Sequence, residues 1–163
     1  MPIRIEMDEK GLEKIINMQV KASEELILEA LRKTCIDIVT MAKAKTDTYI
    51  DDTNNLRSSI GFAIYNNGQK TDERFFKSGT GTGTRRVKKG EEAKPSDGKE
   101  GIETGKRIAD EIAKGYPKGM VAVVVAGMPY AYEVEHEHNK DVLTGSWLQF
   151  DRVFKDILRE FLR

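Results

Sequence analysis

A long amphipathic pattern in the first third of the chain restricts the fold more than any other feature. Apolar residues recur three or four positions apart among balanced charges, which predicts a helix from about residue 9 to residue 45. A break near Ala22 and Ser23 is the alternative to one continuous helix. A helix of this length exceeds the usual globular range, so it is expected to lie across a sheet or against neighbouring subunits. Cys35, the single cysteine, lies on the apolar stripe and is expected to be buried.

The composition indicates a single globular domain. The chain has 163 residues, of which 39% are hydrophobic and 33% are charged, and this length is enough to bury a sizeable core. Its 27 basic and 27 acidic residues cancel, which argues against a globally basic nucleic-acid binder. No apolar run reaches the ~20 residues that span a bilayer, and the first residues lack the apolar core of a signal peptide. We therefore expect a cytoplasmic protein without a membrane segment.

Several short segments have the composition of β-strands. The run Met120–Ala126 is apolar on both faces, so it is expected to be a central strand that is covered on each side. Residues 66–68, with the sequence Asn-Asn-Gly, are a strong signal for a tight turn after a strand. The expected strands are Ile3–Met7, Ile60–Tyr65, Arg74–Phe76, Met120–Ala126 and Tyr130–Glu137.

The second half of the chain contains a charged loop and two further predicted helices. Residues 78–101 are rich in glycine and charge and almost free of apolar side chains, which predicts a mobile loop. A short amphipathic helix is expected over residues 102–114, and a last helix with an apolar stripe from about Thr144 to Leu162. We therefore predict an α+β fold for the single domain 1–163. A small mixed or antiparallel sheet would be packed by the long N-terminal helix and the C-terminal helix, with a mobile charged insert.

His136 and His138 are spaced like metal ligands. Two residues apart on a strand, their imidazoles would share a face and could reach one cation. A protein zinc site needs at least three protein ligands and no third is evident, so a solvated strand end is favoured and no cofactor is expected. One alternative is a contact between this acidic stretch and a basic surface of a neighbour. A metal-dependent hydrolase that uses both histidines is the enzymatic alternative, but no catalytic motif such as G-x-S-x-G accompanies them.

A basic cluster lies in the predicted mobile loop. Such a loop can contact DNA phosphates without sequence specificity, through counterion release. A solvated loop is the simpler interpretation and is favoured. The preceding Gly-Thr repeat at residues 79–84 lacks the spacing of a P-loop, so it is interpreted as a linker. The residues of the cluster are Arg85, Arg86, Lys88 and Lys89.

Two short motifs resemble those of the HK97 gp10-like family of phage neck proteins. After the long predicted helix, residues 53–60 follow the family pattern T-G-x-L-x-x-S-I, with Asn54 where that pattern has glycine. Because Asn also tolerates a left-handed backbone conformation, the same turn is expected. Residues 130–137 are similar to a second pattern, Y-A-x-x-V-E-x-G, with Glu137 in place of the glycine. The matching residues are Thr53, Leu56, Arg57, Ser59, Ile60, Tyr130, Ala131, Val134 and Glu135.

The resemblance implies a structural protein of a phage or prophage virion and not an enzyme. Proteins of this family belong to the neck, the head-tail connector between portal and tail, where copies form a ring around the DNA channel. The implied partners are copies of the chain and the neighbouring head-closure and tail proteins, with non-specific DNA contact in the channel. The implied locations are the virion neck and, during assembly, the cytoplasm of the bacterial host.

Relative to the family pattern, residues from about 70 to 118 form an atypical insert. The position of the motifs makes Arg57 and Glu135 candidates for ion pairing between subunits or between core and loop. Two other functions stay open at this point. A nucleic-acid-binding module would act through residues 85–89 with strong salt dependence. A tail completion or terminator protein would use a related fold at another position in the virion.

Overall fold

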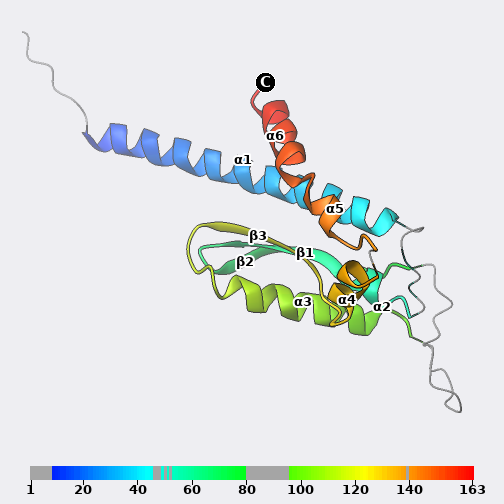
Figure 1. The fold of residues 1–163 in the computed structure, drawn as a ribbon. Coiled ribbons are helices and arrows are strands. Elements are labelled where there is room, and N and C mark those ends of the chain that lie inside the picture. The colour runs from blue at the N-terminus through cyan, green and yellow to red at the C-terminus, as the bar shows by residue number, and fades with distance from the viewer. Residues whose placement is uncertain (1–8, 46–48, 50, 52, 80–95, 139) are drawn as a thin grey trace, which may run out of the picture.

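The computed structural model describes residues 9–45, 49, 51, 53–79, 96–138 and 140–163, and it has three layers (Figure 1). A three-stranded antiparallel sheet lies in the middle, with the strand order β2-β1-β3. The long helix α1 covers one face of the sheet and α3 covers the other. This arrangement confirms the predicted α+β class. The elements of these layers are α1 (Glu9–Ala44), β1 (Ile60–Asn66), β2 (Gln69–Arg74), α3 (Lys99–Ala113) and β3 (Met120–Ala126).

Shorter helices connect and flank the layers. They are α2 (Asn55–Ser59), α4 (Ala131–His136), α5 (Thr144–Trp147) and α6 (Phe150–Phe161). The helix predicted over residues 144–162 is therefore two helices, α5 and α6. α6 packs on α1 and extends away from the sheet, so α3 and not the C-terminal helix covers the second face (Figure 1). α1 is continuous through Ala22 and Ser23, and the predicted strand Ile3–Met7 lies outside the described residues.

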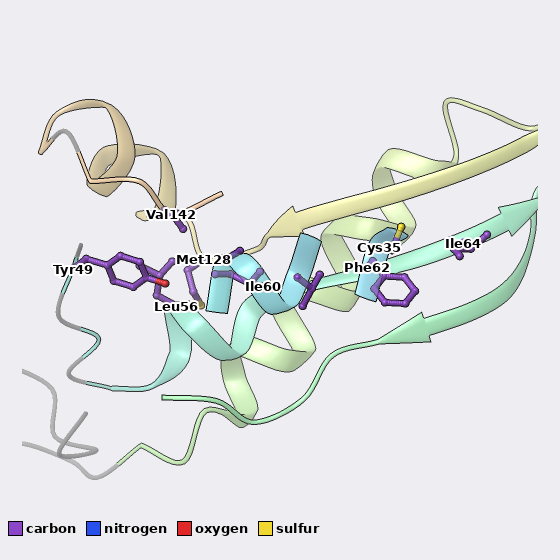
Figure 2. Packing of buried hydrophobic residues seen from close by; sticks show 11 residues of the cluster. Cys35, Tyr49, Leu56, Ile60, Phe62, Ile64, Met128 and Val142 are labelled. Carbon is purple, nitrogen blue, oxygen red and sulfur yellow. The ribbon is translucent and has the colours of Figure 1, made fainter. Parts of the chain in front are cut away.

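β1 is the central strand and the most deeply buried element of the sheet. Its side chains alternate between the two layers: Phe62 and Ile64 belong to the cluster under α1, whereas Ala63 and Tyr65 belong to the cluster over α3. Figure 2 shows the first pair together with Cys35 of α1. Because helices cover both faces, β1 contains no charged residue.

The prediction that Met120–Ala126 is the central strand is wrong, because β3 lies at an edge of the sheet. Both of its faces are nevertheless covered. Ala122 and Val124 pack against the cluster under α1, and Val123 and Val125 pack with α3. An apolar pattern on both faces indicates that two layers cover a strand, but it does not indicate how many strands lie beside it.

β1 and β2 form a hairpin with a two-residue turn. Asn67 and Gly68 have φ angles of 50° and 77°, as a type I′ turn requires, and the turn predicted at residues 66–68 is confirmed. Because this turn reverses the chain at once, the returning strand occupies Gln69–Arg74. The strand predicted at Arg74–Phe76 is wrong for that reason.

Small residues let α3 lie very close to α2, which leads into the central strand. Gly101, Gly105, Ala109 and Ala113 recur four positions apart and are its buried residues. A Cβ atom on Gly105 would lie 2.6 Å from the carbonyl oxygen of Ser59, much closer than carbon and oxygen atoms approach without a bond. The helix therefore packs through its backbone along this face.

The segment predicted as a mobile loop, residues 78–101, ends in helix. α3 starts at Lys99, three residues before the predicted start at residue 102, and its end at Ala113 is one residue from the predicted one. Glycine costs about 1 kcal/mol relative to alanine inside a helix, so a glycine-containing first turn resembles a loop in sequence. Residues 80–95 lie outside the described part of the chain.

Cys35 is buried, as predicted. Its side chain has no exposed surface and lies in the cluster between α1 and the sheet (Figure 2). Burial, assisted by the negative charge of Asp72, raises the pKa of the thiol to about 12. The thiol therefore stays protonated at neutral pH, and it lacks the thiolate character of a nucleophile.

Replacing Gly105 with alanine is expected to destabilise the fold. The added methyl group would meet the Ser59 carbonyl oxygen at 2.6 Å and the Phe75 ring at 2.7 Å, so α3 must move away from α2 and Phe75. We expect the free energy of unfolding, measured by chemical denaturation, to fall by about 1–3 kcal/mol, despite the better helix propensity of alanine. Gly115→Ala is the matched control, because the nearest atom to an added Cβ there is 3.4 Å away. Equal effects of both changes would contradict the close packing.

Candidate assembly interface

Arg57, the arginine of the first motif, closes the C-terminal end of α1. Its side chain is buried. One terminal nitrogen donates hydrogen bonds to the carbonyl oxygens of Lys43 (2.6 Å) and Lys45 (3.0 Å), and the other donates to Lys45 (3.0 Å). The last carbonyls of a helix have no partner within the helix, so a buried cation there satisfies them and complements the helix dipole. The ring of Tyr49 packs beside the guanidinium, 4.8 Å from ring centre to the central carbon.

Asp51 and Asn54 shape the turn that carries Arg57. The Asp51 carboxylate accepts the backbone N–H groups of Arg57 (2.7 Å) and Leu56 (3.4 Å), and it thereby holds the N-terminal end of α2. Asn54 has a φ of 61°, which confirms the left-handed turn expected where the family pattern has glycine. The Thr53 hydroxyl accepts a further backbone hydrogen bond within this turn.

Ser59 joins α2 to the segment that follows β3. Its hydroxyl donates to the carbonyl of Leu56 (2.7 Å) and accepts the N–H of Met128 (3.2 Å), while its own carbonyl accepts the N–H of Gly127 (3.3 Å). Leu56, Ile60 and Met128 lie in the same buried cluster (Figure 2). These contacts tie the first motif to the chain immediately before the second.

The second motif forms the short helix α4, so the strand predicted over residues 130–137 is wrong. The alternating apolar pattern of this stretch also fits one side of a helix, because Ala131 and Val134 are three positions apart. Both pack against the buried cluster under α1, while Tyr130 is partly exposed at the surface. A segment this short has too few apolar residues to distinguish the two-residue period of a strand from the 3.6-residue period of a helix.

Glu135 has a role at α5 that corresponds to the role of Arg57 at α1. One carboxylate oxygen accepts the N–H groups of Leu143 (3.3 Å) and Thr144 (2.7 Å), which are the first donors of α5. The hydrogen bonds that the structure gives Arg57 and Glu135 therefore go to backbone groups of their own chain. Glu135 also lies near Tyr49: burial raises the pKa of that phenol to about 12, and the charge of Glu135 contributes to the rise.

The two motifs thus meet in one place, which we call the motif junction: residues 53–60 and 127–135. It joins the C-terminal end of α1, the start of β1, the end of β3 and the start of α5. Residues that match the family patterns therefore contribute to the contacts that hold these four elements together.

Lys43 is a buried charge beside the motif junction that the sequence prediction did not single out. Its ammonium donates to the carbonyl oxygen of Phe76 (2.8 Å) and lies 3.6 Å from the centre of the Phe76 ring. Burial, together with the positive charge of Arg57, lowers the pKa of Lys43 to about 8. Its position four residues after buried Val39, on the same side of the helix, is the signal that could have identified it.

The first half of α1 presents apolar side chains that the described part of the chain leaves uncovered. Figure 1 shows this half projecting beyond the sheet. Met18 is 63% exposed and Ile15 is 55% exposed. Single exposed apolar residues are ordinary, but a contiguous group marks an interaction surface. Met18 lies among the polar residues Lys14, Asn17 and Lys21. The group on one side of the helix, called the α1 stripe below, consists of Leu12, Ile15, Ile16, Val20 and Ile27.

α5 and α6 also expose apolar side chains. Trp147, Leu148 and Leu162 are exposed, and no residue of α6 is fully buried. The rings of Trp147 and Phe150 lie 4.8 Å apart, and Phe150 also packs against the main buried cluster. The apolar stripe expected on the last helix is therefore only half-buried on α1, and part of it is free to meet another chain.

The structure separates the two histidines. His136 is the last residue of α4 and stacks on Tyr132 with ring centres 4.0 Å apart, while His138 lies beyond the helix. Because residues two apart on a helix point in different directions, the two imidazoles do not share a face as predicted for a strand. In the described residues, no group of three His, Cys, Asp or Glu side chains could hold a metal ion. The candidate DNA contacts Arg85, Arg86, Lys88 and Lys89 lie outside the described part.

No helix among the described residues is long and apolar enough to cross a membrane. No protein-family model, curated protein or solved structure matches the chain. The motif junction and the exposed apolar surfaces are therefore interpreted from their own geometry.

Replacing Arg57 with methionine is expected to lower the free energy of unfolding by about 3 kcal/mol. The variant leaves buried carbonyl groups at the end of α1 without a donor, and each such group loses both water and its partner. Chemical denaturation measures the change. Arg107→Met is the matched control: Arg107 is exposed and pairs with Glu111 one helical turn away, so a change within about 0.5 kcal/mol is expected. A loss below about 1 kcal/mol for Arg57→Met would rule out the capping role.

Lys43 is expected to make folding stability rise with pH above neutrality. Its pKa is about 8 in the folded chain against 10.5 for an ordinary lysine. Between these values the unfolded chain holds a proton that the folded chain has released, so stability increases with pH. The free energy of unfolding of the natural protein minus that of Lys43→Met should therefore grow by about 2 kcal/mol from pH 7 to pH 9.5.

The difference between the two proteins isolates Lys43 in this measurement. The raised pKa values of Cys35, Tyr49 and Tyr65 act in the opposite direction, because the unfolded chain loses those protons first. These contributions are common to both proteins and cancel. A difference that does not change with pH would mean that Lys43 is solvated in the folded chain.

Proposed function

We propose that this chain is a structural subunit of the neck, or head-tail connector, of a phage or prophage, and that copies of it form a ring around the DNA channel. The α1 stripe carries the proposal, because it is a half-helix of apolar side chains left uncovered by the described part of its own chain. Covering it with a neighbour would remove apolar area from water, at about 25 cal/mol per Å².

The motif junction supports the family to which the proposal assigns the chain. The two family patterns are about 70 positions apart in sequence, yet Ser59 of the first pattern hydrogen-bonds to Met128, two residues before the second. Asn54 adopts the backbone conformation that the glycine of the pattern would have. Motif matches that share one structural task are stronger support than matches scattered over the fold.

The proposed mechanism is geometric, and the proposal includes no enzymatic reaction and no cofactor. Each subunit would hold its layers at fixed angles through the motif junction and present the α1 stripe to the next subunit. Residues 85–89 would contact DNA phosphates in the channel without sequence specificity. The partners would be copies of the chain and the adjoining head-closure and tail proteins, in the virion neck and, before that, in the cytoplasm of the bacterial host.

Ile16→Lys is the variant that tests this role of the α1 stripe. Ile16 is 49% exposed, so a lysine there leaves the fold intact while placing a charge in the proposed interface. We expect the natural protein to form discrete larger species as its concentration rises, and Ile16→Lys to require about a tenfold higher concentration, corresponding to roughly 1.4 kcal/mol. Light scattering over a wide concentration range measures the mass.

Ile112→Lys is the matched control, because Ile112 is 43% exposed on α3, in the layer on the other side of the sheet. It should assemble like the natural protein. The same series is repeated with short duplex DNA. Assembly that does not depend on DNA supports the connector, whereas a strict monomer that binds DNA and releases it with salt would favour a nucleic-acid-binding module instead.

A further inference from the structure

Within the described structure, no strand pairs with the outer edge of β3. In the β1–β3 ladder, Gly127 donates to Ser59 and Asn67 donates to Gly119, and in this register the hydrogen-bonded pairs fall on odd-numbered residues. The N–H and C=O groups of the even-numbered residues Ala122, Val124 and Ala126 therefore point away from β1. Among the described residues, no hydrogen bond reaches these groups.

The two edges of the sheet differ in how they are protected. β2 carries Lys70, Asp72 and Glu73, which form ion pairs with each other or with the helices, and its pairing with β1 is irregular at one point. Charges and irregularities of this kind prevent another strand from pairing. β3 has seven residues, none of them charged or proline. An edge of that length and composition is a template for strand addition.

Residues 3–7 of a second copy fit this edge. They lie outside the described residues, but their sequence alternates Ile3, Ile5 and Met7 with Arg4 and Glu6, as a strand with one apolar face does. A five-residue strand fits within the seven residues of β3, and its apolar face would extend the apolar cover of the sheet.

The segment cannot reach β3 of its own chain. Leu28 is the most N-terminal residue of α1 in the cluster against the sheet, and Glu9 lies about 29 Å farther along the helix at 1.5 Å per residue. Residue 7 is two peptide units from Glu9, a span of at most about 7 Å. Only the β3 edge of another copy is therefore within reach of residues 3–7.

We infer that copies of this chain exchange strands: residues 3–7 of one subunit add to the outer edge of β3 in the next. This rests on the proposed ring, and it names the contact that joins its subunits. The α1 stripe of the donor would lie on the acceptor and direct the segment to the edge. The contact is heterologous, because the donor and acceptor surfaces differ, and such contacts generate rings when the rotation closes.

Hydrogen exchange of the β3 amides tests the strand exchange. In dilute, monomeric protein the outward amides of Ala122, Val124 and Ala126 should exchange quickly, and those of Val123 and Val125 slowly. In the assembled protein the outward amides should slow by about tenfold or more, because a new strand accepts their hydrogen bonds. In a chain that lacks residues 2–8 this protection should be lost.

The outcomes separate this inference from the proposed ring. Assembly with unprotected outward amides overturns the strand exchange and leaves the ring in place. Protection that survives removal of residues 2–8 also overturns it, because another strand, such as β3 of a second copy, then occupies the edge. A chain that stays monomeric at every concentration overturns both.

A pair of substitutions at one position provides an independent test on the acceptor side. Ala122→Pro removes an outward N–H without removing a bond to β1, whereas Ala122→Ser keeps the N–H and adds a similar small side chain. Ala122→Pro should raise the concentration needed for assembly by about tenfold, and Ala122→Ser should not. Equal assembly of both variants contradicts strand addition at this edge.

Discussion

The buried guanidinium of Arg57 is the interaction on which the rest of the structure depends. It ends α1 by binding the carbonyls of Lys43 and Lys45, and it belongs to the turn that starts β1. The direction of the longest helix is therefore set by the same residue that leads into the central strand. Because the charge is buried and its two terminal nitrogens donate to backbone oxygens, a shift of α1 would leave these polar groups unpaired, which opposes a change in the angle between helix and sheet.

Much of the fold could be predicted from local sequence signals that have one structural meaning. The helix Glu9–Ala44 follows from a long periodic pattern, and the strand Ile60–Asn66 with its turn follows from an apolar run before Asn-Asn-Gly. The left-handed Asn54 follows from the resemblance to a glycine-containing motif. Each of these depends on neighbours in sequence, so a single sequence contains the necessary information.

The remaining features depend on contacts between distant segments, which local patterns do not contain. The apolar run Met120–Ala126 is covered on both faces, but only the tertiary structure decides that β3 is an edge strand. The glycines at the start of α3 are typical of a loop in sequence. Only the tertiary structure shows that Ser59 and Phe75 pack against Gly105. At the candidate interface, motif positions identified Arg57 and Glu135, but their backbone partners and the buried Lys43 depend on how four elements converge.

The burial of Cys35 has a practical consequence for any study of assembly. The only thiol of the natural sequence is fully enclosed and protonated at neutral pH, so alkylating reagents and maleimide dyes would find no target on the folded protein. A cysteine introduced at any surface position would become the single reactive group. Fluorescent labels, spin probes and site-directed cross-links can therefore be placed on the natural background, without first removing a residue that fills the core.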